Sequence, residues 1–403
     1  MAKTKKFENR TLILYTLALA NFIHIVDSML IMPLGDIFIK EFEISSQQYS
    51  YLVSAYALSA FVSSLVGVFY LDRFDRRRAL LLIYTGFGIG TLACAFAQSY
   101  LQLVSLRILT GFFGGMLGAL VLSVISDLYK FKERGAAMGI IFTAFSAASA
   151  LGIPIGIYLA ASSTWHLPFL ILGVLAILIC VFMYFFFPEM QEHLSQQSEK
   201  VDFVKTLKNI FGDPNQVNAL LAGFILVIAH FMIIPYISPY LIKNVGLTQF
   251  EISYQFFFGG IATIITSPYI GRLTDKYGVM RVFTIVMFLS FIPTVLITNL
   301  APISIGIAIT YTTIFFITGT GRMISPNTII TAAAGVANRG SFMSVKSALQ
   351  QLAIGLSSIV GGRIVVIGAD GYFHHYEYVG YLSIAFGIIA IFMVRRIKVA
   401  EGN

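Results

Sequence analysis

Long apolar runs constrain the fold of this chain more than any other feature of the sequence. Runs of about 20 residues recur along the whole sequence, and as helices they would each cross a hydrocarbon layer about 30 Å thick. Only 11% of the 403 residues are charged, against about 25% in a soluble domain. The runs are continuous rather than alternating, which disfavours a β-barrel. The sequence therefore predicts an all-α polytopic membrane protein.

Twelve transmembrane helices are expected, six on each side of a polar segment. The first six are 11–39, 47–71, 78–98, 101–126, 135–161 and 166–187, and the last six are 216–242, 249–271, 281–299, 302–326, 342–368 and 376–394. This pattern predicts two six-helix bundles, 1–187 and 216–403, joined by a cytoplasmic linker, 188–215. Within the linker, "VDFVKTLKNIF" has the apolar spacing of a short surface helix.

The positions of Lys and Arg predict the orientation of the chain. If the N-terminus is cytoplasmic, nearly all of these residues outside the spans lie in cytoplasmic segments, and only Lys40 and Lys243 lie on the opposite side. Basic residues favour the cytoplasmic side of a membrane, so both termini are expected there. The same distribution explains the net charge of +8 without a nucleic-acid partner.

No cofactor or metal site is expected. Cys94 and Cys180 lie inside apolar runs, where cysteine usually acts as a small packing residue. The sequence has no Gly-x-x-x-x-Gly-Lys-Ser/Thr loop, which argues against an ATP-driven pump.

Two pairs of short motifs indicate an internal repeat. "GVFYLDRFDRRRALL" from Gly67 is similar to "GRLTDKYGVMRVF" from Gly271, and "ERGAAMG" from Glu133 is similar to "NRGSFMS" from Asn338. The members of each pair lie about half the chain apart. Parallel halves with a binding site at their interface, near the bilayer midplane, are one transporter architecture.

These loops resemble the signature loops of the major facilitator superfamily. The second-half loop matches the superfamily pattern at Gly271, Asp275, Lys276 and Gly278. The first-half loop departs from it at Val68 and Asp75, where glycines are usual. "RILTGFFGGMLGAL", "ASALGIPIGIYLA" and "TWHLPFLILGVL" resemble the superfamily's signatures in helices four, five and six. The chain looks most similar to the bacterial twelve-span drug/proton and sugar-efflux antiporter branch.

The resemblance implies a secondary active transporter that works by alternating access. The expected function is proton-coupled efflux, by antiport, of a small organic molecule across the bacterial inner membrane, by a monomer. A proton-coupled uptake symporter for a sugar or other metabolite is the alternative. A membrane-embedded lipid-modifying enzyme is disfavoured because no Ser-His-Asp or His-Glu array is present. A receptor that has lost transport is disfavoured by the presence of Asp27 and Arg107.

Asp27 and His24 form the strongest cluster of ionisable residues within a span. They are three residues apart and share one helix face. Ionisable residues inside a membrane usually mark function, because exposing them to lipid is costly. At 1.5 Å of rise per residue, Asp27 lies about 18 Å and Arg107 about 10 Å from the outer ends of their helices, a difference that their side chains can span. We expect Asp27 to be the proton-coupling site, Arg107 its alternating partner, and His24 a residue that tunes or relays the proton. The alternatives are a static ion pair, a direct substrate contact and a histidine that only packs.

Three further sets of residues are candidates for function. The candidates for a substrate cavity are His230, Tyr236, Tyr254, Gln255, Gln350, Gln351 and Arg363. Pro235 and Pro239 are expected to interrupt the helix that carries His230. A cytoplasmic gate network is expected from Asp72, Arg73, Arg76, Arg77, Asp127, Arg134, Asp275, Lys276 and Arg281. In helix five, Gly152, Pro154 and Gly156 predict a close helix seam, which would either pack the bundle or block proton leak.

Overall fold

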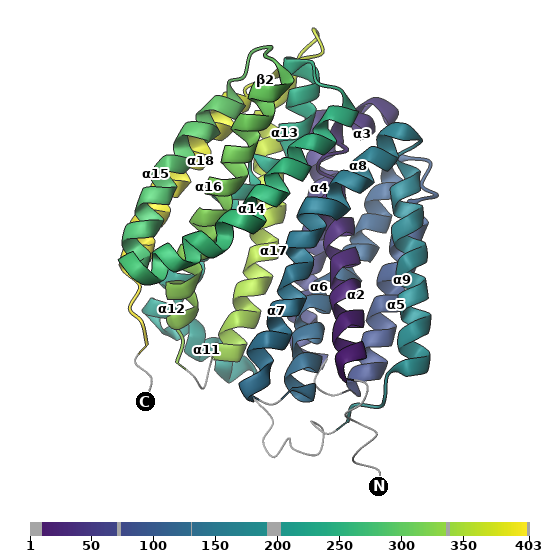
Figure 1. Ribbon diagram of the computed structural model, residues 1–403, viewed down its shortest axis with the longest axis vertical. Coiled ribbons are helices and arrows are strands. Elements are labelled where there is room, and N and C mark those ends of the chain that lie inside the picture. The colour runs from purple at the N-terminus through teal and green to yellow at the C-terminus, as the bar shows by residue number, and fades with distance from the viewer. Residues whose placement is uncertain (1–9, 71–73, 130, 192–202, 336–338, 401–403) are drawn as a thin grey trace. The chain divides into compact units, whose positions relative to one another are not determined.

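The computed structural model describes residues 10–70, 74–129, 131–191, 203–335 and 339–400. These ranges are almost entirely helical (Figure 1). The exception is a short antiparallel hairpin of β1 (Val366–Ile367) and β2 (Phe373–His374), in which Val366 pairs with His374. The prediction of an all-α membrane fold is confirmed.

Helices lie at every expected span. In the first half they are α2 (Arg10–Leu30), α3 (Gly35–Glu41), α4 (Ser46–Tyr70), α5 (Arg76–Cys94), α6 (Tyr100–Leu128), α7 (Phe131–Ala147), the π-helix η2 (Ala148–Gly152), α8 (Ile153–Ser162) and α9 (His166–Phe186). In the second half they are α11 (Phe203–Gly212), α12 (Pro214–Phe231), α13 (Ile234–Tyr240), the π-helix η3 (Leu241–Val245), α14 (Gln249–Tyr277), α15 (Val279–Thr298), α16 (Ile305–Ala332), α17 (Arg339–Ile364) and α18 (Tyr376–Arg395).

Within the described ranges, 9 helical segments are long and apolar enough to cross a membrane. Helices α5, α14 and α17 fall outside this set. Each of the three carries charged residues: α5 begins with three arginines, and α14 ends in "GRLTDKY". In α14 and α17, polar residues within the span, including Gln255, Gln350 and Gln351, further lower the apolar character.

Prolines break one helix and leave another continuous. The helix carrying His230 is interrupted near Pro235, as expected: α12 ends at Phe231, and α13 begins at Ile234. Pro239, which was also expected to interrupt it, lies inside α13. The expected span 302–326 is too short, however, because α16 continues through Pro326 to Ala332. Proline removes one backbone hydrogen bond, and a membrane offers no other backbone partner, so continuing the helix leaves fewer groups unsatisfied.

The chain divides into two compact units. Unit 1 comprises Met1–Leu30 and Ala55–Val201, and unit 2 comprises Ile31–Ser54 and Asp202–Asn403. The segment Ile31–Ser54 thus groups with unit 2, although by sequence it belongs to the first expected bundle. Tyr49 fixes it there, donating its hydroxyl to the carbonyls of Met32 at 2.9 Å and Pro235 at 3.0 Å.

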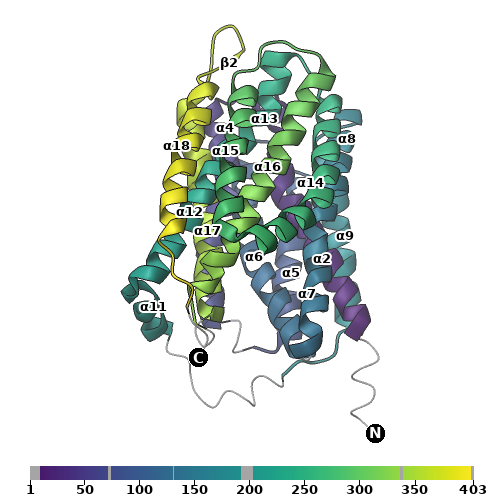
Figure 2. The same ribbon diagram turned by 60° about the vertical axis from the view of Figure 1, so that its left-hand side comes forward.

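Unit 2 contains a continuous apolar core to which α12 contributes. Helices α17 and α18 lie beside α12 (Figure 2). The surface helix expected in the linker forms as α11, and its Ile210 is fully buried in this core together with Phe283 and Phe342. Burying such side chains stabilises a fold by about 1.5–3 kcal/mol each, so the core holds α11 against the rest of unit 2.

Candidate functional site

The centre of unit 1 is a fully buried ion pair. Asp27 of α2 is 0% exposed and Arg107 of α6 is 1% exposed. Arg107 Nη1 donates to Asp27 Oδ2 at 2.9 Å, and Nη2 donates to the Asp27 backbone carbonyl at 3.2 Å. Ser99 caps the start of α6 and accepts a bond from the Gln102 amide, which fixes Arg107 two turns into that helix. The structure therefore brings together Asp27 and Arg107, the two residues that the sequence analysis expected to be partners.

An aromatic side chain joins His24 to this ion pair. Tyr56 of α4 lies with its ring 4.5 Å from the Arg107 guanidinium carbon, a favourable cation–π distance. The Tyr56 hydroxyl forms a 2.9 Å hydrogen bond with His24 Nε2. His24 forms no hydrogen bond with Asp27 itself, so its connection to the carboxylate runs through Tyr56 and Arg107. The sequence analysis missed Tyr56, because a tyrosine within an apolar span carries no cue to its depth or partner.

Glycines of α6 make this arrangement possible. At Gly111 a β-carbon would collide with the carbonyl oxygen of Tyr56, and it would lie 2.8 Å from the Tyr56 Cα. At Gly114 a β-carbon would collide with the Tyr56 hydroxyl, and it would lie 3.1 Å from His24 Nε2. Small residues of this kind let membrane helices approach closely. The packing of α6 on α4 thus depends on glycine at the position where the site forms.

Several polar atoms of the site have no partner within the described ranges. They are Asp27 Oδ1, Arg107 Nε, His24 Nδ1, Thr91 Oγ1 and the Tyr84 hydroxyl, all of them buried. Native interiors leave few polar atoms unsatisfied, and each such atom needs a reason. A free Oδ1 lets the Asp27 carboxylate take up a proton while Oδ2 still faces Arg107.

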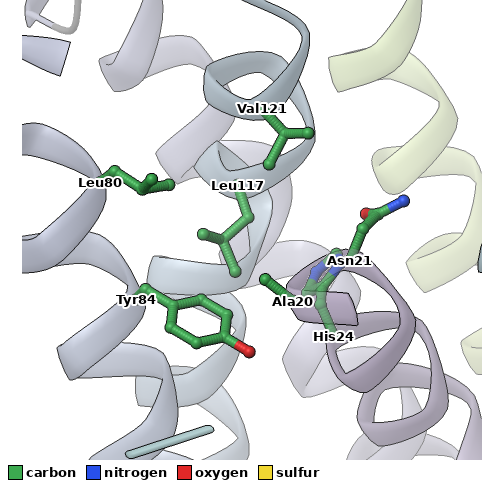
Figure 3. A pocket seen from close by; sticks show the side chains of 7 residues that line it. All are labelled: Ala20, Asn21, His24, Leu80, Tyr84, Leu117 and Val121. Carbon is green, nitrogen blue, oxygen red and sulfur yellow. The ribbon is translucent and has the colours of Figure 1, made fainter. Parts of the chain in front are cut away.

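A narrow pocket borders His24 on the side toward the start of α2. It is lined by Ala20, Asn21, His24, Leu80, Tyr84, Leu117 and Val121 (Figure 3). Leu80 lies one turn into α5, and Val121 lies two turns before the end of α6. The pocket therefore lies between His24 and the end of unit 1 where α5 begins.

The glycines of helix five pack against the part of α2 that carries Asp27. At Gly152 a β-carbon would collide with Val26, and at Gly156 it would lie 2.7 Å from Leu30 Cδ1. Pro154 stands in the first turn of α8, directly after the π-helix η2. The expected seam is thus a contact of η2 and α8 with Val26 and Leu30 of α2, which are one and three residues from Asp27.

The expected gate residues of unit 1 make separate contacts. Arg76 Nε lies 3.0 Å from Asp127 Oδ2, and Arg77 donates to the Tyr184 carbonyl. Arg134 donates to carbonyls at the end of α6, those of Ser126 at 2.7 Å and Tyr129 at 3.1 Å, rather than to an acid. Asp72 and Arg73 lie outside the described residues. The described contacts therefore join helix ends in pairs.

Asp75 has a definite role at the position where the superfamily pattern has glycine. Its φ is −51°, and its side chain caps α5 by accepting from the Arg78 amide at 2.9 Å. The same side chain also accepts from the Met190 amide at 2.7 Å. No left-handed backbone is needed there. Gly278 of the second-half loop has a φ of +86°, a conformation that favours glycine. The two loops are therefore related in sequence but differ in backbone.

The second-half gate residues are exposed. Asp275, Lys276 and Arg281 are all at the surface, and none of them forms an ion pair with another residue of the described chain. The structure does not bring them together with Arg76 or Asp127.

The candidates for a substrate cavity fall into two groups. His230 is half-buried, Tyr236 and Gln255 are fully buried, and Gln351 is half-buried. Tyr254, Gln350 and Arg363 are exposed. Tyr236 donates its hydroxyl to the Ser358 carbonyl at 3.0 Å, which occupies the group that would contact a substrate. His230 Nδ1 accepts a hydrogen bond from Arg322 Nη2 of α16 at 2.9 Å. Arg322 lies within an apolar run of the sequence, and it was not among the expected site residues.

Comparison with known proteins gives the family. A family model described as Major Facilitator Superfamily matches residues 17–321 and 219–402. The chain belongs to the major facilitator superfamily. This membership and the apolar helices agree with a multi-pass membrane protein of a transporter family. This membership confirms the resemblance seen in the loop motifs.

Within the described part of the chain, no cluster of His, Cys, Asp and Glu suits a metal ion.

Curated relatives of this superfamily chain include transporters with different names. The uncharacterized MFS-type transporter YceJ of Bacillus subtilis is 24% identical over 255 residues, which are 63% of this chain and 65% of YceJ. Multidrug resistance protein 2 of Bacillus subtilis is 25% identical over 310 residues, 72% of this chain and 75% of that protein. The vacuolar membrane amino acid uptake transporter fnx2 of Schizosaccharomyces pombe is 35% identical over 138 residues, 34% of this chain and 24% of fnx2. The chain matches less than two thirds of YceJ and of fnx2.

Solved superfamily structures share the fold. A bacterial homolog of the human lysosomal transporter Spinster, inward-facing and occupied, is similar with a TM-score of 0.76 at 16% identity, covering 96% of this chain and 97% of that one. The inward-open xylose transporter XylE from E. coli gives a TM-score of 0.74 at 17% identity, covering 97% of each chain. At such identities the likeness shows the fold alone.

Proposed function

We propose that this chain is a proton-coupled efflux transporter, which exchanges protons for a small organic molecule by alternating access. The observation that carries the proposal is the Asp27–Arg107 pair: both side chains are fully buried, and Asp27 keeps one oxygen free. Ionisable side chains inside a membrane are costly and usually mark function. A charge that is switched during function would explain why the chain keeps this pair.

The proposed cycle uses the two oxygens of Asp27 differently. In the ionised state, Oδ2 holds Arg107 at 2.9 Å. A proton added to Oδ1 makes the carboxylic acid neutral and weakens its attraction for the guanidinium, which loosens α2 from α6. Loss of that proton on the other side of the membrane restores the pair. Proton uptake on one side and release on the other thereby drives substrate in the opposite direction.

We propose that His24 and Tyr56 tune the proton site. Tyr56 lies between His24 and Arg107, and a guanidinium only donates hydrogen bonds, so a change at His24 reaches Asp27 through the contacts of Arg107 rather than as a transferred proton. His24 also lines the narrow pocket near the start of α5. Gly152 and Gly156 pack against Val26 and Leu30, on either side of Asp27 in α2, and we propose that this seam blocks proton leak. We further propose that the transporter is a monomer in the bacterial inner membrane, with both termini in the cytoplasm.

Removing one hydroxyl tests the link between His24 and the ion pair. In Tyr56→Phe, the ring remains beside Arg107 but the 2.9 Å bond to His24 is lost. We expect this variant to fold normally and to bind substrate, while the pH dependence of transport shifts because His24 loses its link to the ion pair. The measurement is the transport rate in proteoliposomes across a pH series. An unchanged pH profile would show that His24 only packs beside Phe87, whose ring lies 5.5 Å away.

We propose that the Asp127–Arg76 pair is part of a cytoplasmic gate, which predicts different effects on transport for substitutions of Asp127 and Asp275. The side chain of Asp127 is 32% exposed and pairs with Arg76, whose side chain is 8% exposed, whereas Asp275 is exposed and forms no described ion pair. A pair of this kind contributes up to about 1 kcal/mol, which corresponds to about a fivefold change in an equilibrium. We expect Asp127→Asn to change the transport rate severalfold and Asp275→Asn to change it little. Equal effects of the two variants would contradict a gate at Asp127.

Uptake symport is the second candidate function. The name of one relative refers to amino acid uptake and that of another to multidrug resistance, so names of relatives support either direction. The direction of proton movement that accompanies substrate entry distinguishes the two candidates.

A further inference from the structure

Arg322 is a buried cation without an anionic partner. Its side chain is among the largest that are fully buried, with 1% exposed. Nη2 donates to the Ala229 carbonyl at 3.3 Å and to His230 Nδ1 at 2.9 Å, while Nε has no partner in the described chain. No carboxylate within the described ranges lies at ion-pair distance from it. An unpaired buried charge is costly, so Arg322 requires an explanation.

The internal repeat relates this site to the Asp27–Arg107 pair. His230 follows Asp27 by the same number of residues by which Asp275 follows Asp72. Asp27 lies in α2 and faces an arginine of α6; His230 lies in α12 and faces an arginine of α16. Unit 2 thus pairs the same two helices as unit 1, with an imidazole in place of the carboxylate. The arginine itself is not at the repeated position, because Arg322 follows Arg107 by 215 residues rather than by the 203 that separate His230 from Asp27. The negative charge present in unit 1 is missing from the equivalent position in unit 2.

The hydrogen bond from Arg322 decides which nitrogen of His230 carries the proton. A guanidinium has donors only, so His230 Nδ1 accepts and Nε2 carries the hydrogen. The ring stacks on Phe315 with centroids 5.8 Å apart, and it fills the space above Gly319, where a β-carbon would lie 2.6 Å from its Cε1. The ring is therefore fixed, with a single N–H left to donate.

That N–H is free to meet a ligand. His230 is half-buried, its Nε2 forms no hydrogen bond with any residue that the structure describes, and Nε2 is not among the fully buried atoms that lack a partner. Arg322, directly behind the ring, polarises this donor toward an acceptor. Arg322 is not needed to hold α12, because Ser383 of α18 already donates to the same Ala229 carbonyl at 2.5 Å. A role limited to helix packing leaves the positive charge unexplained.

We propose that His230 and Arg322 bind an oxyanion group of the transported molecule, of the carboxylate or phosphate type. His230 Nε2–H donates to one oxygen of this group, and Arg322 supplies the opposite charge. The bound anion then provides the counter-charge that the chain lacks. This inference rests on the proposed function in one respect, that the molecule is a transported substrate.

Matched pairs of an acid and its amide test the proposal. The full-length protein in lipid nanodiscs is mixed with benzoate, nicotinate or indole-3-acetate, with the primary amide of each, or with inorganic phosphate. The Tm of the protein is then measured. We expect at least one anion to raise the Tm well above the value with its neutral twin. Charge-assisted hydrogen bonds suggest that Arg322→Gln will weaken anion binding about tenfold or more. Arg322→Lys should retain part of it, and Arg272→Gln at an exposed arginine of α14 should retain all of it.

Two results would overturn the proposal. One is that no anion in the panel raises the Tm more than its amide does; the other is that the preference for anions survives in Arg322→Gln. If Arg322→Gln does not fold, His230→Phe replaces it, since a phenyl ring keeps the stacking on Phe315 but cannot donate. Loss of the preference in His230→Phe supports the proposal, and retention overturns it.

The Asp27→Asn variant separates this inference from proton coupling, when its preference for anions is measured by Tm and its transport in proteoliposomes. Asp27→Asn lies in unit 1 and should keep the preference for anions while it loses pH-driven transport. A protein that transports with protons but prefers no anion would refute the oxyanion site alone. A protein that prefers anions but moves no protons would refute the coupling alone.

Discussion

The Asp27→Asn variant should bind substrate and lose all transport driven by a pH gradient. Asparagine keeps an oxygen that can accept from Arg107, but it cannot take up or release a proton. Substrate is first identified by a thermal-shift screen at two pH values. Uptake into proteoliposomes is then measured with and without an imposed pH gradient. Full gradient-driven transport in Asp27→Asn would end the proposed role of Asp27.

Stability provides the control for this variant. Removing one charge leaves Arg107 buried without a carboxylate, and breaking a buried pair costs about 3–5 kcal/mol. Asp27→Asn should therefore be less stable than the wild type. The double variant Asp27→Asn with Arg107→Gln removes both charges and should regain much of the stability, while it still fails to couple transport to protons. A static ion pair predicts instead that transport recovers together with stability.

The Gly111→Val variant should lose both stability and transport. A side chain at Gly111 meets the backbone of Tyr56, with Cα at 2.8 Å and carbonyl carbon at 2.9 Å, and backbone atoms cannot rotate aside. Overpacking costs about 1–3 kcal/mol, and contact with backbone places this variant at the upper end. Moving α4 away from α6 also takes Tyr56 away from His24 and Arg107.

The same helix offers a matched control. At Gly118 an added β-carbon meets nothing within 4 Å, so Gly118→Val should change stability by no more than about 0.5 kcal/mol. The measurement is the unfolding midpoint of each purified variant, together with its transport rate. Equal destabilisation by the two variants would mean that the loss of glycine matters, rather than the contact with Tyr56.

The helical spans could be predicted from the sequence because each depends on one local property. The length of an apolar run decides whether a segment can cross a membrane, and the described helices follow the expected runs closely. Helix ends were less predictable: α16 passes through Pro326 because backbone satisfaction outweighs the local effect of proline. Asp75 caps α5, a role that the glycine pattern of the superfamily loop did not suggest.

The site was predictable in part, and for a physical reason. Asp27 and Arg107 are charged groups inside apolar runs, at depths that their side chains can bridge, so depth and the family resemblance together pair them. Tyr56 and Arg322 were missed because their roles depend on which helices meet, through Gly111 in one case and the position of His230 in the other. The packing of Ile31–Ser54 with unit 2 likewise depends on contacts that hydropathy does not report.

Proton movement coupled to substrate tests the central claim most directly. Proteoliposomes with a pH-sensitive dye in the lumen receive substrate from outside, and the lumenal pH is followed. Proton antiport predicts that the lumen becomes alkaline as substrate enters and protons leave, and that neither empty liposomes nor the Asp27→Asn variant respond. An acidified lumen would contradict antiport and establish symport, and an alkaline response that persists in Asp27→Asn would contradict the role of Asp27.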